Sequence, residues 1–112
     1  MGQYVTSTPT RNSVIYSTFL NTASLGTTQI LAGVTNQKIR VVSAAIVTTL
    51  ANSVKFLSAA TDISATFPLG ANGGIVLPYN DHGWVQTNAG EALQINLSVA
   101  TSTAIHVQYI VL

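Results

Sequence analysis

The strictest pattern in the sequence is an alternation of apolar and polar residues near its C-terminal end. From residue 93 to residue 99 the odd-numbered positions are apolar, and the even-numbered positions are Gln94, Asn96 and Ser98. Because successive side chains of a strand point to opposite faces, this period of two predicts a strand with one buried and one hydrated face. The alternation returns over residues 105–112, where Ile110 and Leu112 interrupt the polar face. We expect these two side chains to contact a neighbour.

The rest of the chain also favours short strands. Segments rich in β-branched and aromatic residues recur every eight to twelve residues between turn formers, and no apolar spacing of three and four is sustained. The expected strands cover residues 13–20, 28–31, 38–50, 54–58, 63–69, 75–77 and 84–87, besides the two above. About eight or nine such strands predict an all-β fold, a single-domain antiparallel β-sandwich or a barrel.

The first residues differ from this pattern. Residues 1–12 are polar and β-branched and contain Pro9, which predicts an extended N-terminal arm without a core of its own. Residues 13–112 then form the β-sandwich domain.

The segment from Lys38 to Leu50 is the longest expected strand and is apolar on both faces. Alternation puts Ile39, Val41, Ala45 and Val47 on one face and Val42, Ala44, Ile46 and Leu50 on the other. A strand of this kind is covered on both sides, and we expect the second cover to be another subunit. The candidate interface residues are Val42, Ala44, Ile46, Trp84, Ile110 and Leu112.

Charge is scarce in this chain. Charged residues make up 6% of it, against about 25% in ordinary soluble domains. Thr, Ser, Asn and Gln together supply 39 of the 112 residues, which suits a protein packed among copies, where an unpaired buried charge is costly. Four Lys and Arg residues are too few for a nucleic-acid ligand, and no apolar run is long enough to span a membrane.

The sequence contains few residues that could act in catalysis or bind a metal ion. With no cysteine, the groups that could exchange protons or bind a metal are Asp62, Asp81, Glu91, His82 and His106. Asp81 and Glu91 could be read as the carboxylate pair of a glycosidase, although a turn aspartate and a solvated glutamate explain them equally. A zinc site needs three convergent ligands, which His82, Asp81 and His106 would have to supply. We expect no catalytic residue, no metal and no cofactor, and hence no enzyme.

Trp84, the single tryptophan, follows the loop that begins at Tyr79. It could anchor the core or a sheet edge, anchor a subunit interface, or serve as a platform for a ligand.

From Lys38 onward, the order of the expected strands and turns resembles that in a family of small tailed-phage virion proteins, the head decoration or cement type. The resemblance is carried by residues 38–43, 54–58, 73–78, 83–87, 89–93 and 105–109, and the span from the first to the last of these covers about two thirds of the chain. It implies a jelly-roll-like sandwich, usually a homotrimer, bound to the major capsid protein on the capsid surface of the virion, without catalytic residues. The alternative is a module of a phage tail fibre or spike that contacts host glycans through residues 79–84.

Overall fold

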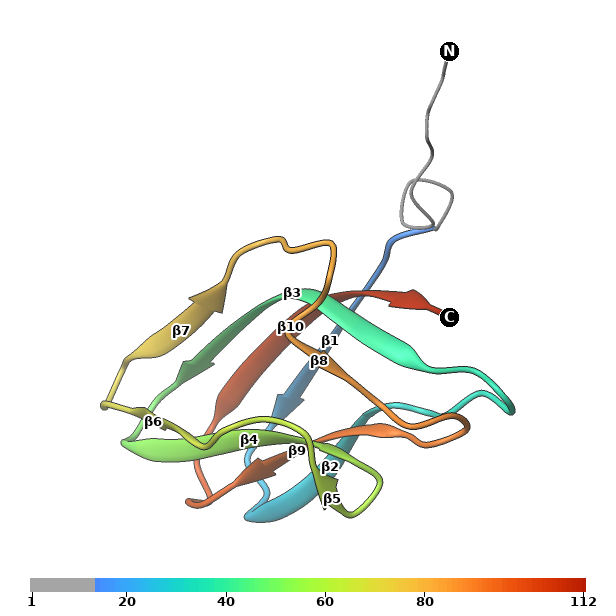
Figure 1. The fold of residues 1–112 in the computed structure, drawn as a ribbon. Coiled ribbons are helices and arrows are strands. Elements are labelled where there is room, and N and C mark those ends of the chain that lie inside the picture. The colour runs from blue at the N-terminus through green and yellow to red at the C-terminus, as the bar shows by residue number, and fades with distance from the viewer. Residues whose placement is uncertain (1–13) are drawn as a thin grey trace.

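The computed structural model describes residues 14–112, and these form ten strands with no helix among them (Figure 1). None of the described segments is therefore a helix that could cross a membrane. The expected arm, residues 1–12, lies outside the described residues. The strands are β1 (Tyr16–Thr22), β2 (Gly26–Leu31), β3 (Ile39–Thr48), β4 (Asn52–Ser58), β5 (Thr61–Asp62), β6 (Phe67–Leu69), β7 (Gly74–Leu77), β8 (Val85–Gln86), β9 (Leu93–Leu97) and β10 (Thr103–Val111).

The strands form two antiparallel sheets that pack face to face. Sheet A has the order β1-β10-β3-β7 and sheet B the order β2-β9-β4-β5 (Figure 1). The short strand β8 extends the β7 edge along β3, and β6 does the same for β5 along β4. Counting each interrupted edge as one strand leaves eight strands in the orders 1-8-3-6 and 2-7-4-5. This is the connectivity of a jelly roll, so the all-β sandwich is confirmed.

The core lies between the two sheets. Its fully buried side chains include Phe56, Ile95 and Leu97 from sheet B and Ile46 and Ile105 from sheet A. Leu93, Ile95 and Leu97 all point into it, as their alternation predicts, and Val99 lies beyond the end of β9. The regular period of two thus places the apolar side chains of β9 correctly.

A β-bulge in β3 overturns the predicted faces of residues 38–50. Gln108 pairs with Ser43 but Tyr109 pairs with Val41, so Val42 is an extra residue without a partner on β10. In a regular strand, residues on the same face are an even number of positions apart. The extra residue makes this number odd for any two residues on opposite sides of the bulge, so the alternation reverses there. Ile39 and Val41 share the core with Ala44 and Ile46, whereas Ala45 and Val47 point outward. The prediction that Ala44 and Ile46 lie on the face opposite to Ile39 and Val41 is wrong.

Candidate functional site

The outer face of sheet A carries an apolar patch, and the one charged side chain that β3 presents there, Arg40, lies beyond the patch and hydrogen-bonds to Gln86 of β8. Three rows of outward residues cross the strands in the order β1, β10, β3, β7. The rows are Asn21–Ala104–Val47–Gly74, Phe19–His106–Ala45–Val76 and Ser17–Gln108–Ser43. Phe19 is 68% exposed and Val76 is 73% exposed, so this face presents large apolar groups to solvent. We call these eleven residues the A face.

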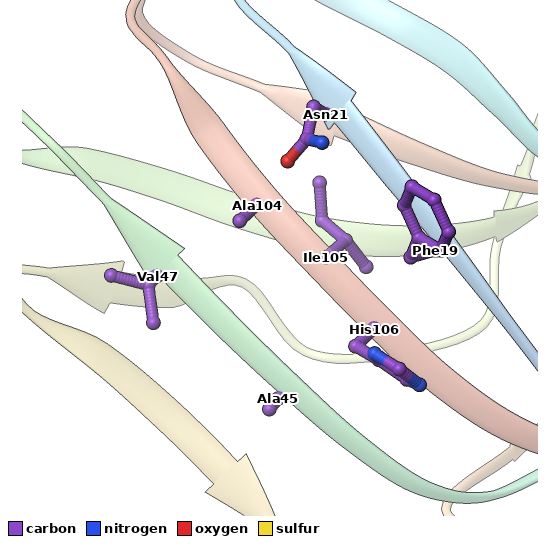
Figure 2. A pocket seen from close by; sticks show the side chains of 7 residues that line it. All are labelled: Phe19, Asn21, Ala45, Val47, Ala104, Ile105 and His106. Atoms are coloured by element: carbon purple, nitrogen blue, oxygen red, sulfur yellow. The ribbon is translucent and has the colours of Figure 1, made fainter.

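The A face is hollowed in its middle. One hollow of about 290 Å³ is lined by Phe19, Asn21, Ala45, Val47, Ala104, Ile105 and His106 (Figure 2). A second, of about 260 Å³, runs from His106 toward Tyr79 and shares Ala45 with the first. The small side chains of Ala45 and Ala104 create the depression between the bulkier residues on the outer strands. The hollows form a shallow groove across the sheet.

Four of the five polar side chains on the A face are paired with one another. Ser17 Oγ lies 2.7 Å from His106 Nε2, and Ser43 Oγ donates a hydrogen bond of 2.7 Å to Gln108 Oε1. The Phe19 ring lies beside the His106 ring, with centroids 6.4 Å apart. A serine beside a histidine is one half of a nucleophilic site, but no carboxylate hydrogen-bonds to His106 within residues 14–112. The contact organises the surface and lacks the third member that orients a catalytic histidine.

The outer face of sheet B has the opposite character. Thr27, Gln29, Lys55, Gln94 and Asn96 point outward there. Asn96 Nδ2 donates to Thr27 Oγ1 at 3.0 Å, and Lys55 Nζ forms an ion pair of 3.0 Å with Asp62. This face suits water, so the sandwich has one hydrated side and one side with an apolar patch that contains no charged residue.

The residues predicted as an interface fall into two groups. Ala44 and Ile46 are core residues, and Val42 and Ile110 are fully buried outside the main core cluster. These four have almost no exposed surface to offer a neighbour in the folded chain. Trp84 and Leu112 are 43% and 40% exposed, and their place in an interface stays a prediction.

The loop between β7 and β8 holds the aromatic residues considered as a ligand platform. Its backbone is fixed to β3, because the N–H groups of Asn80 and Trp84 donate to the carbonyl oxygens of Val42 and Val41. The Trp84 indole Nε1 donates to Pro78 O at 2.7 Å, and the Tyr79 ring is exposed. A hydrogen bond with the Asp81 carboxylate raises the pKa of Tyr79.

The acidic residues considered for catalysis have separate local partners. Asp62 pairs with Lys55, and the Glu91 carboxylate accepts hydrogen bonds from Ser58 Oγ and Asn88 Nδ2. These two hydrogen bonds lower the pKa of Glu91. No group of three or more histidines or carboxylates that could hold a metal occurs in the described part of the chain.

The residues that distinguish the A face are not evident from the sequence. Phe19, Ala45, Val47 and Val76 were assigned to strands but not to a common surface. Phe19 and His106 face each other although they are far apart in the chain, and this requires the register of β1 on β10. The one available signal is the alternation Ser17–Phe19–Asn21, in which a phenylalanine stands between two polar residues on one face of β1.

Comparison with known proteins assigns no family. Neither a protein-family model nor a curated protein matches the sequence. Among solved structures, the chain is similar to a protein of the Bacillus endospore appendages, a family of disulfide-linked pili. The TM-score is 0.46 and the identity 13%, over 97% of this chain and 96% of that chain.

The chain is also similar to the virus-like particle of the extra small virus of the giant freshwater prawn Macrobrachium rosenbergii. The TM-score is 0.47 and the identity 12%, over 98% of this chain and 85% of that chain. Similarities at this level assign neither a family nor an activity. The resemblance to phage decoration proteins therefore stays a prediction.

Proposed function

We propose that this chain is a non-enzymatic structural subunit whose A face is buried in a protein assembly. The observation that carries the proposal is the contrast between the two outer faces of the sandwich. Sheet B exposes an ion pair and hydrogen-bonded amides, whereas the A face exposes Phe19, Val47 and Val76 without a charged side chain. Contiguous apolar surface on a soluble domain marks a contact with another macromolecule.

At a finer level, we propose a decoration or cement protein of a tailed-phage head. Its partners would be the major capsid protein and further copies of itself, up to the homotrimer expected from the resemblance, and its place the capsid surface of the virion. A protein that binds only the assembled shell stabilises that shell by mass action, so no catalytic group is required. Few charges, a compact sandwich and an apolar face all support this proposal.

Copy number is the first test of the proposal. The number of copies per purified particle is measured by gel densitometry against the major shell protein. A lattice-bound protein is expected in hundreds of copies. Absence of the chain from particles would overturn the virion assignment.

A pair of variants tests the face. Val47→Lys places a charge on the A face, and Gln94→Lys places the same charge on the outer face of sheet B. We expect Val47→Lys to lower the occupancy of the particle at least tenfold while the variant keeps its β-sheet circular dichroism. Gln94→Lys should keep full occupancy. Equal occupancy for both variants would contradict burial of the A face.

The second candidate is the glycan-binding module of a tail fibre or spike. It is favoured by the exposed rings of Tyr79 and Trp84 on a loop that is hydrogen-bonded to β3. Aromatic faces of this kind stack on apolar faces of ligands. A handful of copies per particle, together with loss of host-glycan binding in Trp84→Ala, would favour this candidate over the first.

A further inference from the structure

Phe19 and the hollow beside it form a projection and a depression on the same surface. Phe19 lies on β1, the edge strand of sheet A, and is the most exposed aromatic side chain of the described residues. Its ring forms one wall of the 290 Å³ hollow, whose other walls come from Asn21 of β1 and from residues of β10 and β3 (Figure 2). The ring therefore borders the hollow without filling it.

The geometry restricts how a second copy could use these features. A projection and a depression on one face can engage their counterparts in another copy only when the two faces meet. Such a contact is reciprocal, since each copy supplies both elements, and a reciprocal contact between identical chains has two-fold symmetry.

We propose that two copies of this chain pack A face to A face, with Phe19 of each copy inserted into the hollow beside Ala104 of the other. The inference rests on the proposed function in one respect, namely that the A face is covered by protein. It goes further by naming a second copy of this chain as the partner and a two-fold axis as the symmetry.

The absence of charge supports a second copy as the occupant. An interface between copies doubles every charge that it contains, and like charges repel when they are buried together. The A face has no charged side chain among its eleven residues, so it meets itself without this penalty. A strongly charged partner would instead leave its own charges unpaired against this surface.

Four of the five polar side chains of the A face also tolerate being covered. His106 hydrogen-bonds to Ser17, and Gln108 accepts from Ser43 within the same copy. Buried polar groups cost free energy mainly when they lose their partners. These two pairs keep theirs when a second sheet lies over them.

The size of the face sets the strength of the contact. With strands about 4.8 Å apart and a rise of about 3.4 Å per residue, three rows across four strands cover roughly 300 Å². A standard interface buries about 800 Å² on each partner. We therefore expect a weak dimer, detectable near millimolar concentration and strengthened where many copies are held together on a lattice.

Sedimentation velocity over a range up to about 1 mM, with wild type and three variants, tests the proposal. Wild type is expected to shift from monomer to dimer. Phe19→Asp removes the projection and Ala104→Lys obstructs the hollow, and each should stay monomeric. Gln29→Asp adds one carboxylate to the outer face of sheet B and should dimerise as wild type does.

Mixing the variants tests reciprocity. An equimolar mixture of Phe19→Asp and Ala104→Lys can form a heterodimer with one native insertion and one ion pair. Dimer is therefore expected in the mixture although neither variant dimerises alone. A wild type that stays monomeric at 1 mM, a dimer or trimer that survives both substitutions, or a mixture that stays monomeric would each overturn the two-fold contact.

The outcomes separate this inference from the proposed function. Monomeric wild type that still occupies particles in hundreds of copies refutes the two-fold contact alone. A wild type that dimerises as described but is absent from particles refutes the virion assignment alone.

Discussion

Ser58 and Glu91 are joined by a hydrogen bond of 2.5 Å between the end of β4 and the turn before β9. Ser58 is fully buried, and its Oγ also accepts from the backbone N–H of Asn88. Asn88 Nδ2 in turn donates to the Glu91 carboxylate at 3.1 Å. This small network ties the turn to sheet B and gives Glu91 a structural role.

The network predicts a component of stability that depends on pH. The hydrogen bonds lower the pKa of Glu91 in the folded chain below its ordinary value of 4.5. The stabilisation is therefore complete above about pH 4.5 and is lost as the pH falls through the lowered pKa. Thermal unfolding of wild type and Glu91→Gln should differ near neutral pH and converge toward pH 2. Parallel profiles over this range would contradict the assignment.

Ile46 and Val47 are adjacent on β3, but Ile46 points into the core and Val47 lies on the A face. Ile46→Thr places a hydroxyl in the core and should lower the free energy of unfolding by at least about 2 kcal/mol. Val47→Thr changes an exposed side chain of similar shape and should stay within about 0.5 kcal/mol of wild type. Urea denaturation measures both. Equal losses would mean that the register of β3 is wrong.

The buried side chain of Asn52, at the start of β4, is expected to stabilise the fold through its hydrogen bonds. Its buried Oδ1 accepts hydrogen bonds of 3.0 Å from the backbone N–H groups of Ser98 and Val99. Asn52→Ala removes this acceptor and should lower the free energy of unfolding by about 1–3 kcal/mol. Asn52→Asp keeps an acceptor at the site and should recover part of the loss in the same urea titration. An Asn52→Ala chain as stable as wild type would contradict the role of this side chain.

Gly74 lies where the backbones of β7 and β3 come too close together to leave room for a side chain. A Cβ atom at this position would lie 2.2 Å from the carbonyl oxygen of Ile46, which is backbone and cannot rotate away. Gly74→Ala should lower the melting temperature by several degrees, since a loss of about 1 kcal/mol shifts it by roughly 4–8 °C in a domain of this size. Gly70→Ala is the control, because a Cβ there has no atom within 4 Å. A similar melting temperature for both variants would show that β7 moves to accommodate the methyl group.

Regular alternation made some parts of the fold predictable from sequence. The strands around residues 93–97 and 103–111 were located correctly because their inner positions are apolar and their outer positions are mostly polar. The strands expected at residues 75–77 and 84–87 correspond to β7 and β8, whereas residues 63–69 were expected as one strand and only Phe67–Leu69 pairs with β4. Which pieces share an edge depends on the neighbouring strands, and no local pattern contains that information.

The bulge explains why Ala44 and Ile46, two of the candidate interface residues, lie in the core. One unpaired residue, Val42, reverses the alternation within β3, and a valine there does not differ in type from the valine before it. The A face also depends on pairs between distant segments, such as Phe19 with His106, which no local pattern contains. The sequence was therefore sufficient to infer that these strands exist. The composition of the A face could be found only from the register in which the strands pair.

The pairing of β1 with β10 has a consequence for the order in which the subunit is made. Ser17 and His106 are 89 positions apart in the chain. In the same way, β2 can pair with β9 only after β9 has been synthesised. Contacts between such distant segments form slowly, because a long loop must close before they contribute. A chain emerging from the ribosome exposes β1 without a partner until β10 has been synthesised. The hollow that receives Phe19 therefore exists only in the completed sandwich, and self-association through it is confined to subunits that have finished folding.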